Sequence, residues 1–185
     1  APPHFIHQST RHFLTLDQIS GLQVISYEGK VICVPKFQGL RSDYLNKEMV
    51  ALSPNTVAVV DTTDAKNIYI LDATTAKQVA KITHTSAEVT QISLNQQAVT
   101  VQERILAFCD RNRDLYVASL NVSGNAQITP SMVFKMHSHV ESFMFNDETD
   151  VLVGLADGRL NTWHSPGVPF IDKDLLPLTL TSVDA

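Results

Sequence analysis

Four strand-like runs recur along this chain at a nearly constant interval. They end at Ile25, Leu71, Ala118 and Trp163, so successive ends lie 45 to 47 residues apart. The last three runs follow short polar turns, which is the chemistry expected where one strand reverses into the next. A period of this length is typical of β-propeller blades, which contain four strands each. The chain is therefore predicted to consist of repeats.

The segments between these runs predict an all-β fold. Apolar or alternating runs of five to seven residues are separated by turn residues, and almost no segment has a helical period. With 44% hydrophobic residues, the 185-residue chain can bury the core of a single domain. We expect one partial propeller over residues 1–185, with a strap at 172–185 leading toward a next blade, and four-stranded blades at about residues 4–36, 48–83, 87–136 and 139–172.

Four blades leave a seven-bladed ring unfinished. Such a ring needs about three blades more than these repeats provide, so the predicted ring is incomplete in this chain. An open ring exposes strand edges with unpaired backbone groups, together with apolar blade faces. We therefore expect either further blades elsewhere in the native polypeptide or self-association through the open ends. A closed four-bladed ring is the alternative.

The fourth copy resembles a WD40 repeat. His137 stands before its first strand, Asp157 opens the turn between its second and third strands, and Trp163 ends the third. The resemblance implies that these three side chains form a hydrogen-bonded structural network, which satisfies polar groups between blade edges. The other copies are degenerate, because their tryptophan position is occupied by Ile25, Leu71 and Ala118.

Four segments narrow this resemblance, at residues 11–19, 40–46, 107–116 and 171–177. In order and spacing they are similar to the second propeller of a WD-repeat subunit of intraflagellar transport complex B. That family implies a non-catalytic scaffold, a structural subunit needed for assembly of the cilium or flagellum, with other complex B subunits as partners. It also implies a location in the cilium or flagellum and at the basal body, on the cytoplasmic side. A WD-repeat adaptor in another cytoplasmic trafficking or coat complex is the alternative.

Charge and hydropathy argue against two kinds of binding. The net charge is −5 and the basic residues are scattered, so we expect no nucleic-acid partner. No apolar run approaches the 18 to 20 or so residues that span a bilayer, so we expect no membrane insertion. Cys33 and Cys109 each lie inside an apolar run and are predicted to be free thiols in a reducing compartment.

Candidate catalytic patterns are incomplete. His137 and His139 could seed a metal site, but no third ligand has a convincing spacing. Serine, histidine and aspartate are present without the Gly-x-Ser-x-Gly turn of a hydrolase, and no glycine loop can hold a phosphate. A propeller enzyme would need polar groups converging near the axis, and no such position repeats. We therefore predict no enzyme activity, no cofactor and no metal.

The turn at residues 110–114 is the most charged tight turn of the chain. Its Arg111 and Arg113 are the candidate partner contact, because a charge-dense turn can bind a complementary surface. The alternative is a structural turn in which Asn112 and Asp114 bond their own backbone. A second candidate surface, formed by Trp163 with Phe143 and Phe145, is interpreted as core, because these residues have strand spacing.

Overall fold

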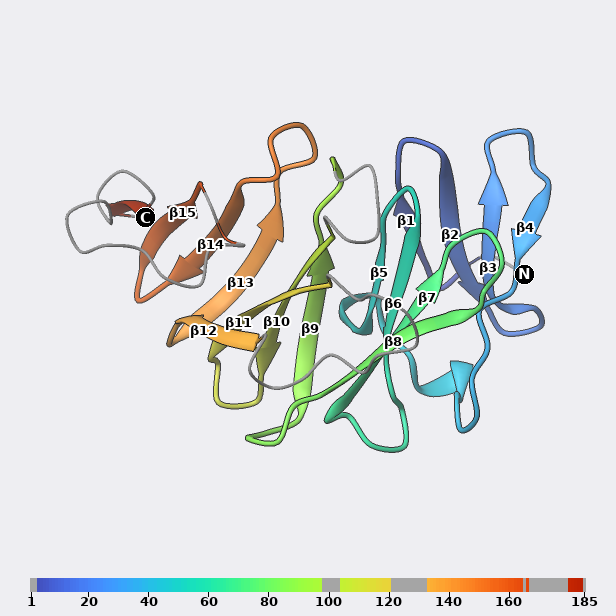
Figure 1. Cartoon of the computed structure of the whole chain (residues 1–185), viewed down its shortest axis with the longest axis horizontal. Coiled ribbons are helices and arrows are strands. Elements are labelled where there is room, and N and C mark those ends of the chain that lie inside the picture. The colour runs from blue at the N-terminus through green and yellow to red at the C-terminus, as the bar shows by residue number, and fades with distance from the viewer. Residues whose placement is uncertain (1–2, 98–103, 121–132, 165, 167–179, 185) are drawn as a thin grey trace.

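The computed structural model describes residues 3–97, 104–120, 133–164, 166 and 180–184. These residues form four antiparallel sheets of four strands each, arranged side by side (Figure 1). The first two sheets contain β1 (Phe5–Gln8), β2 (His12–Asp17), β3 (Gly21–Ser26) and β4 (Val31–Cys33), then β5 (Val50–Leu52), β6 (Thr56–Val60), β7 (Asn67–Asp72) and β8 (Gln78–Thr83). The other two contain β9 (Val89–Leu94), β10 (Ile105–Asp110), β11 (Leu115–Ser119) and β12 (Val133–His137), then β13 (Val140–Phe145), β14 (Leu152–Ala156), β15 (Arg159–Trp163) and β16 (Leu180–Asp184).

Each sheet is a meander in which neighbouring strands follow chain order. The first strands of successive sheets lie against one another, with β1 against β5, β5 against β9 and β9 against β13. Sheets that pack face to face around their first strands have the geometry of propeller blades. The all-β propeller fold predicted from the repeat period is confirmed.

A hydrophobic cluster fills each space between successive sheets. One cluster joins the first and second sheets, a second joins the second and third, and a third joins the third and fourth. Every residue of β6 is buried, because its sheet is covered on both faces. Phe143, Phe145 and Trp163 belong to the third cluster, so their interpretation as core is confirmed.

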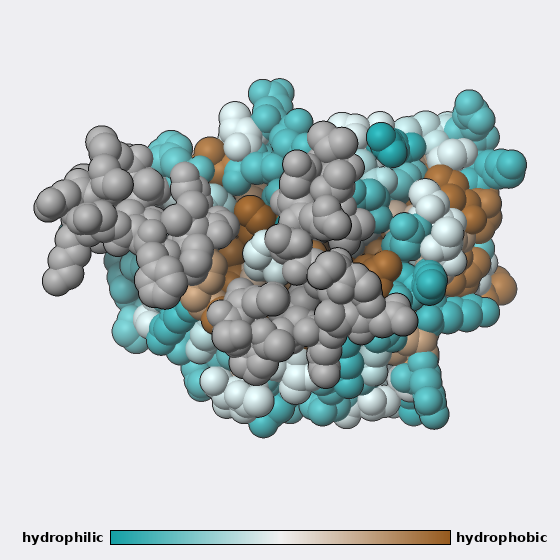
Figure 2. Space-filling view, in the orientation of Figure 1, coloured by the Kyte–Doolittle hydropathy of each residue, from teal (hydrophilic) through white to brown (hydrophobic). Residues whose placement is uncertain are grey.

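The ring is open. The first and fourth sheets lie at opposite ends of the array in Figure 1, and a closed four-bladed ring is excluded. Each end sheet has an uncovered face with exposed apolar side chains. The first sheet exposes Ile6 and Val31, with Tyr27 in the turn between β3 and β4, and the fourth exposes Met144, Leu160 and Val183. Figure 2 shows hydrophobic surface over β3 and β4 at the N-terminal end.

The end of the chain differs from the prediction. Residues 172–185 were expected to form a strap, but β16 pairs with β15, with Leu180 opposite Trp163 and Asp184 opposite Arg159. Residues 180–184 therefore form the outer strand of the fourth sheet. The physical reason is the alternation of apolar and polar residues after Pro177, which suits a strand at the edge of a sheet. Residues 167–172, the end of the predicted fourth blade, lie outside the described residues.

A connector with two short 3-10 helices joins the first two sheets. They are η1 (Ser42–Tyr44) and η2 (Lys47–Met49). The Asn46 side chain begins η2 by accepting hydrogen bonds from the backbone N–H groups of Glu48 and Met49. The connector also touches the first sheet, since a Cβ placed on Gly21 would lie 3.2 Å from Ser42 Oγ. Gly21 has φ +70°, a backbone conformation that residues other than glycine rarely adopt.

His12 is a buried histidine in the first sheet, with 2% of its surface exposed. Burial lowers the pKa of His12 from its ordinary value of 6.5. This effect is larger than that of a hydrogen bond with the backbone of Ser53, which raises the pKa. The unfolded chain therefore takes up this proton at a higher pH than the folded chain does. The contribution of His12 to stability is fully present above about pH 6.5 and is lost as the pH falls below that value.

We expect the urea concentration at the denaturation midpoint to be lower at pH 5.5 than at pH 7.5. The difference is expected to be smaller in His12→Gln. The measurement is urea denaturation of the intact propeller at both pH values. His4→Gln is the control, because His4 is exposed. If the fall is equally steep in His12→Gln and in the wild type, other groups cause the pH dependence.

Candidate functional site

The turn between the second and third strands of each sheet contains an aspartate. We call these four segments the middle turns; they carry Asp17, Asp61, Asp110 and Asp157. Asp17 Oδ1 accepts backbone N–H groups of Ile19 at 2.8 Å and Ser20 at 2.6 Å. Asp61 Oδ1 accepts the backbone N–H of Thr63 at 2.8 Å. Such bonds hold the chain in a tight reversal, which explains why aspartate suits these positions.

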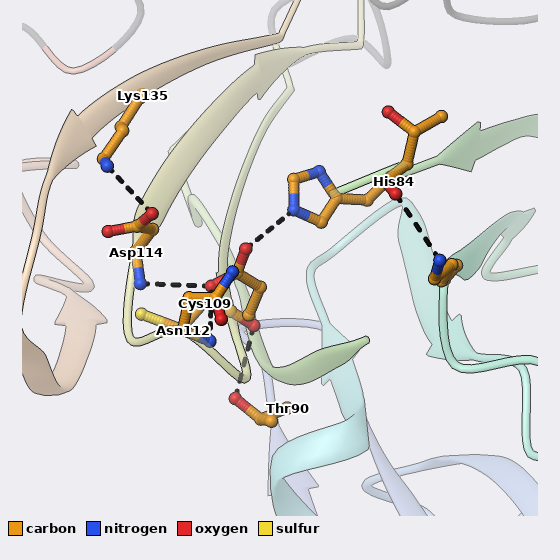
Figure 3. Close-up of polar contacts among 9 residues, drawn as sticks. His84, Thr90, Cys109, Asn112, Asp114 and Lys135 are labelled. Carbon is orange, nitrogen blue, oxygen red and sulfur yellow. Dashed lines mark hydrogen bonds and ion pairs between the residues drawn. The ribbon is translucent and has the colours of Figure 1, made fainter. Parts of the chain in front are cut away.

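Asp110 organises the middle turn of the third sheet, and its side chain is fully buried. Its Oδ1 accepts the backbone N–H groups of Asn112 at 3.0 Å and Asp114 at 3.2 Å. Its Oδ2 lies 2.9 Å from Nε2 of His84, which precedes the first strand of the same sheet (Figure 3). The side chain that bonds the backbone of this turn is thus Asp110, where the sequence had suggested Asn112 and Asp114.

His84 was not predicted as a functional or structural residue. Its ring packs against Tyr116 and Phe108, with centroids 4.5 and 5.1 Å away. Its backbone N–H donates to the carbonyl of Lys66, in the middle turn of the second sheet, at 2.7 Å. His84 therefore connects two sheets. A signal was present in the sequence, because His84 stands before the first strand of its copy as His137 does in the fourth.

The expected network of the fourth copy is only partly assembled. The His137 ring meets Trp163 edge-on, with centroids 5.7 Å apart. The partner of Asp157 is His139, whose Nδ1 lies 3.4 Å from Asp157 Oδ1, and both side chains are more than half exposed. His139 has φ +56°, so the backbone turns sharply after His137. The structure thus brings His137 and Trp163 together and pairs Asp157 with the neighbouring histidine.

Arg111 and Arg113 extend from the middle turn of the third sheet. Arg111 Nη2 lies 2.5 Å from Glu88 Oε2, and Arg113 Nη2 lies 3.4 Å from Glu141 Oε1. All four side chains are at least 43% exposed. The Arg113 carbonyl accepts the backbone N–H of Val140, at the start of the fourth sheet, at 2.9 Å. The backbone of this turn therefore joins two sheets, while its guanidinium groups remain accessible.

Further charged groups lie beside this turn. Lys135 Nζ is 2.8 Å from Asp114 Oδ2 (Figure 3). Burial alone would raise the pKa of Asp114, but hydrogen bonds from Lys135 and Ser138 hold that pKa below its ordinary value. The surface therefore presents charges of alternating sign. Such a pattern suits binding to a complementary protein surface better than binding to a polyanion.

The two cysteines are free, as predicted. Burial is the main cause that raises the pKa of the Cys109 thiol to about 12, so this group is neutral at pH 7. Burial likewise raises the pKa of the Cys33 thiol, whose Sγ lies 3.1 Å from the carbonyl oxygen of Ala73. Neutral thiols packed between sheets have the character of core residues.

Within residues 3–97, 104–120, 133–164, 166 and 180–184, no three histidine, cysteine, aspartate or glutamate side chains gather closely enough to hold a metal ion. In that same part, no helix has both the length and the apolar character needed to span a membrane.

Sheets packed around their first strands, with an aspartate in each middle turn, define a β-propeller protein of the WD-repeat class. Residues 2–185 match the sequence model of the IFT80 second beta-propeller, and the chain belongs to that family. The intraflagellar transport protein 80 homologs of Rattus norvegicus and Mus musculus are each 37% identical to it over 182 residues. The match covers 97% of this chain and 23% of those proteins, so the chain spans about a quarter of their length.

Solved structures support the same fold at much lower sequence identity. Kluyveromyces lactis Hsv2p is similar with a TM-score of 0.57 and 12% identity, over 95% of this chain and 54% of that one. The WD40 repeats of RRP9 give a TM-score of 0.58 and 16% identity, over 88% of this chain and 48% of that one. The chain therefore matches about half of each of these propeller structures.

Proposed function

We propose that this chain is part of a non-catalytic scaffold, a structural subunit of intraflagellar transport complex B that is needed for assembly of the cilium or flagellum. The observation that carries the proposal is the family match over residues 2–185. It is supported by relatives that are 37% identical and are named intraflagellar transport protein 80 homologs. On this proposal the protein acts in the cilium and at the basal body, on the cytoplasmic side.

The geometry supports a scaffold in a specific way. Tightly packed sheets hold the middle turns in place, and the turn of Arg111 and Arg113 presents charged groups to solvent. Because the turn backbone is bonded within and between sheets, little conformational entropy is lost when it binds a partner. The partners would be other complex B subunits, bound through surface complementarity.

The open faces of the first and fourth sheets also require a partner. We propose that further blades of the same native polypeptide cover them, since the relatives extend well beyond the matched region. Self-association through these faces is the alternative. Sedimentation of the full-length protein distinguishes the two, because covered faces give a monomer at concentrations where open faces would associate.

The experiment that tests the proposed function is affinity purification of the full-length protein from ciliated cells. We expect intraflagellar transport subunits to be recovered with it. Recovery of a coat or trafficking complex without those subunits would contradict the proposal and favour an adaptor function.

Reversing the charges of Arg111 and Arg113 to glutamate is expected to weaken assembly of the complex while barely changing thermal stability. The ion pairs with Glu88 and Glu141 are exposed, and exposed pairs contribute about 0 to 1 kcal/mol each. Recovery of subunits and the melting temperature are measured on the same full-length variant. A large fall in melting temperature with unchanged recovery would show that the arginines are structural.

A further inference from the structure

Two exposed apolar side chains are not explained by the open ends of the ring. Among the described residues, eight large hydrophobic side chains are exposed; five of them lie in strands of the end sheets and a sixth, Tyr27, lies in the turn between β3 and β4. The other two are Ile19, which is 84% exposed, and Tyr44, which is 60% exposed. Ile19 belongs to the middle turn of the first sheet and Tyr44 to η1. Both residues lie at the ends of strands, in a turn or a connector, and not on a sheet face.

Ile19 and Tyr44 are chain neighbours of residues that line a cavity of about 280 Å³: Gln18 precedes Ile19, and Asp43 and Leu45 stand on either side of Tyr44. Its walls come from the residue before β1, the end of β2, the first middle turn and the connector, and it is lined by His4, Leu16, Asp17, Gln18, Ser42, Asp43 and Leu45. The two segments that carry Ile19 and Tyr44 are in contact, since Gly21 lies close to Ser42. A cavity of this size can receive one long side chain of a partner.

The middle turn of the first sheet has a different neighbour from the middle turns of the second and third sheets. The carbonyl of Ala65 accepts the N–H of Val89, and the carbonyl of Arg113 accepts the N–H of Val140. The middle turns of the second and third sheets therefore contact the start of the following sheet. For the first sheet, the connector with Ser42 and Leu45 occupies that position. The cavity beside it is thus accessible with the following sheet in place.

The charges around the cavity indicate what would enter it. Hydrogen bonds from the backbone N–H groups of Ser20 and Ile19 hold the pKa of Asp17 below its ordinary value, so this carboxylate is ionised at neutral pH. Asp43 contributes a second carboxylate and bonds Arg41 Nη2 at 3.2 Å. The Arg41 guanidinium also lies over the Tyr44 ring, 4.6 Å from its centroid, and so restrains that ring.

We propose that Ile19, Tyr44 and this cavity form a docking surface for a segment of another transport subunit that carries a lysine next to an apolar residue. The lysine ammonium enters the cavity toward Asp17 and Asp43, and the apolar residue packs between Ile19 and Tyr44. Charge complementarity selects the lysine, and burial of apolar surface adds affinity. The proposal rests on the scaffold function proposed above and assigns one of its contact surfaces.

The first test uses the full-length protein with both Ile19→Asp and Tyr44→Asp. We expect recovery of one transport subunit to fall about tenfold or more, because exposed apolar anchors at an interface often contribute that much to binding. Lys77→Glu is the matched control. Lys77 is exposed in the turn between β7 and β8, at the end of the strands opposite the middle turn of its sheet. Unchanged recovery of every subunit in the double variant overturns the proposal.

The second test identifies the occupant with a carbodiimide, which joins a carboxylate directly to a lysine amine in contact with it. We expect a cross-link from Asp17 or Asp43 to a lysine of another subunit, and its loss in the Asp17→Asn, Asp43→Asn variant. Asparagine keeps a side-chain oxygen that can accept the turn hydrogen bonds of Asp17. A cross-link to the same polypeptide or to a second copy of it, or no cross-link at all, overturns the proposal.

The two proposals fail in distinguishable ways. If the wild-type protein recovers no transport subunits, the scaffold function is wrong. If the wild type recovers them and the Ile19 and Tyr44 variant does so equally well, only the docking surface is wrong.

Discussion

Replacing Asp110 with alanine is expected to destabilise the propeller by about 3 to 5 kcal/mol, because several donors around its buried carboxylate lose their acceptor, and each buried donor left unpaired costs about 1 to 3 kcal/mol. The Asp110 carboxylate is fully buried and accepts hydrogen bonds from two backbone N–H groups, besides pairing with His84 at 2.9 Å. Without it, these groups lose their acceptor in a site that water does not readily reach. The measurement is urea denaturation of the intact propeller, followed by circular dichroism.

Asp17→Ala is the matched control for this prediction. Asp17 occupies the middle turn of the first sheet and also accepts two backbone N–H groups, but it is only partly buried. Its loss is expected to cost much less than the loss of Asp110, because water can replace the turn hydrogen bonds of a partly exposed carboxylate. The excess in Asp110→Ala then measures the buried contact with His84. Equal costs for the two variants would mean that this contact contributes little to stability.

Trp163→Ala is expected to cost about 3 to 5 kcal/mol, because it leaves a cavity between the third and fourth sheets. The Trp163 side chain is 4% exposed and packs on Gly154, where an added Cβ would lie 3.1 Å from Trp163 Cζ3. The chain contains one tryptophan, so unfolding of this variant must be followed by circular dichroism.

Trp163→Leu provides the comparison. Leucine occupies the equivalent position of the second sheet as Leu71, which is completely buried. We expect Trp163→Leu to cost less than the alanine variant, about 1 to 2 kcal/mol, since leucine fills part of the same space. If both variants cost the same, the indole makes an interaction other than packing. If neither changes the denaturation midpoint, the third cluster is not a stabilising core.

Much of the fold could be predicted, because strand alternation and turn chemistry are local properties. The four run ends are evenly spaced, and each lies in or at the end of the third strand of its sheet: Ile25, Leu71, Ala118 and Trp163. The last strand could not be located in this way. Two apolar segments follow Trp163, and only pairing with β15 selects residues 180–184 as the outer strand.

The candidate site was harder to predict from the sequence than the fold. Arg111 and Arg113 were found because charge density is visible in a turn, but their partners Glu88 and Glu141 come from other segments. The pairing of His84 with Asp110 was missed, because the two residues are 26 positions apart and meet only when the sheet forms. In the fourth copy, the sharp turn at His139 changed the expected partner of Asp157.

The residues alone predicted a repeating all-β chain and the propeller class, because period and alternation do not depend on long-range contacts, but they left a closed four-bladed ring as the alternative to an unfinished ring. The tertiary structure excluded the closed ring and decided which distant segments meet: His84 with Asp110, Arg113 with Glu141, and the turn at Gly21 with the connector at Ser42. The physical reason is that hydrogen bonds, ion pairs and cavities depend on distances of a few ångströms between distant segments, and these distances exist only once the sheets have packed.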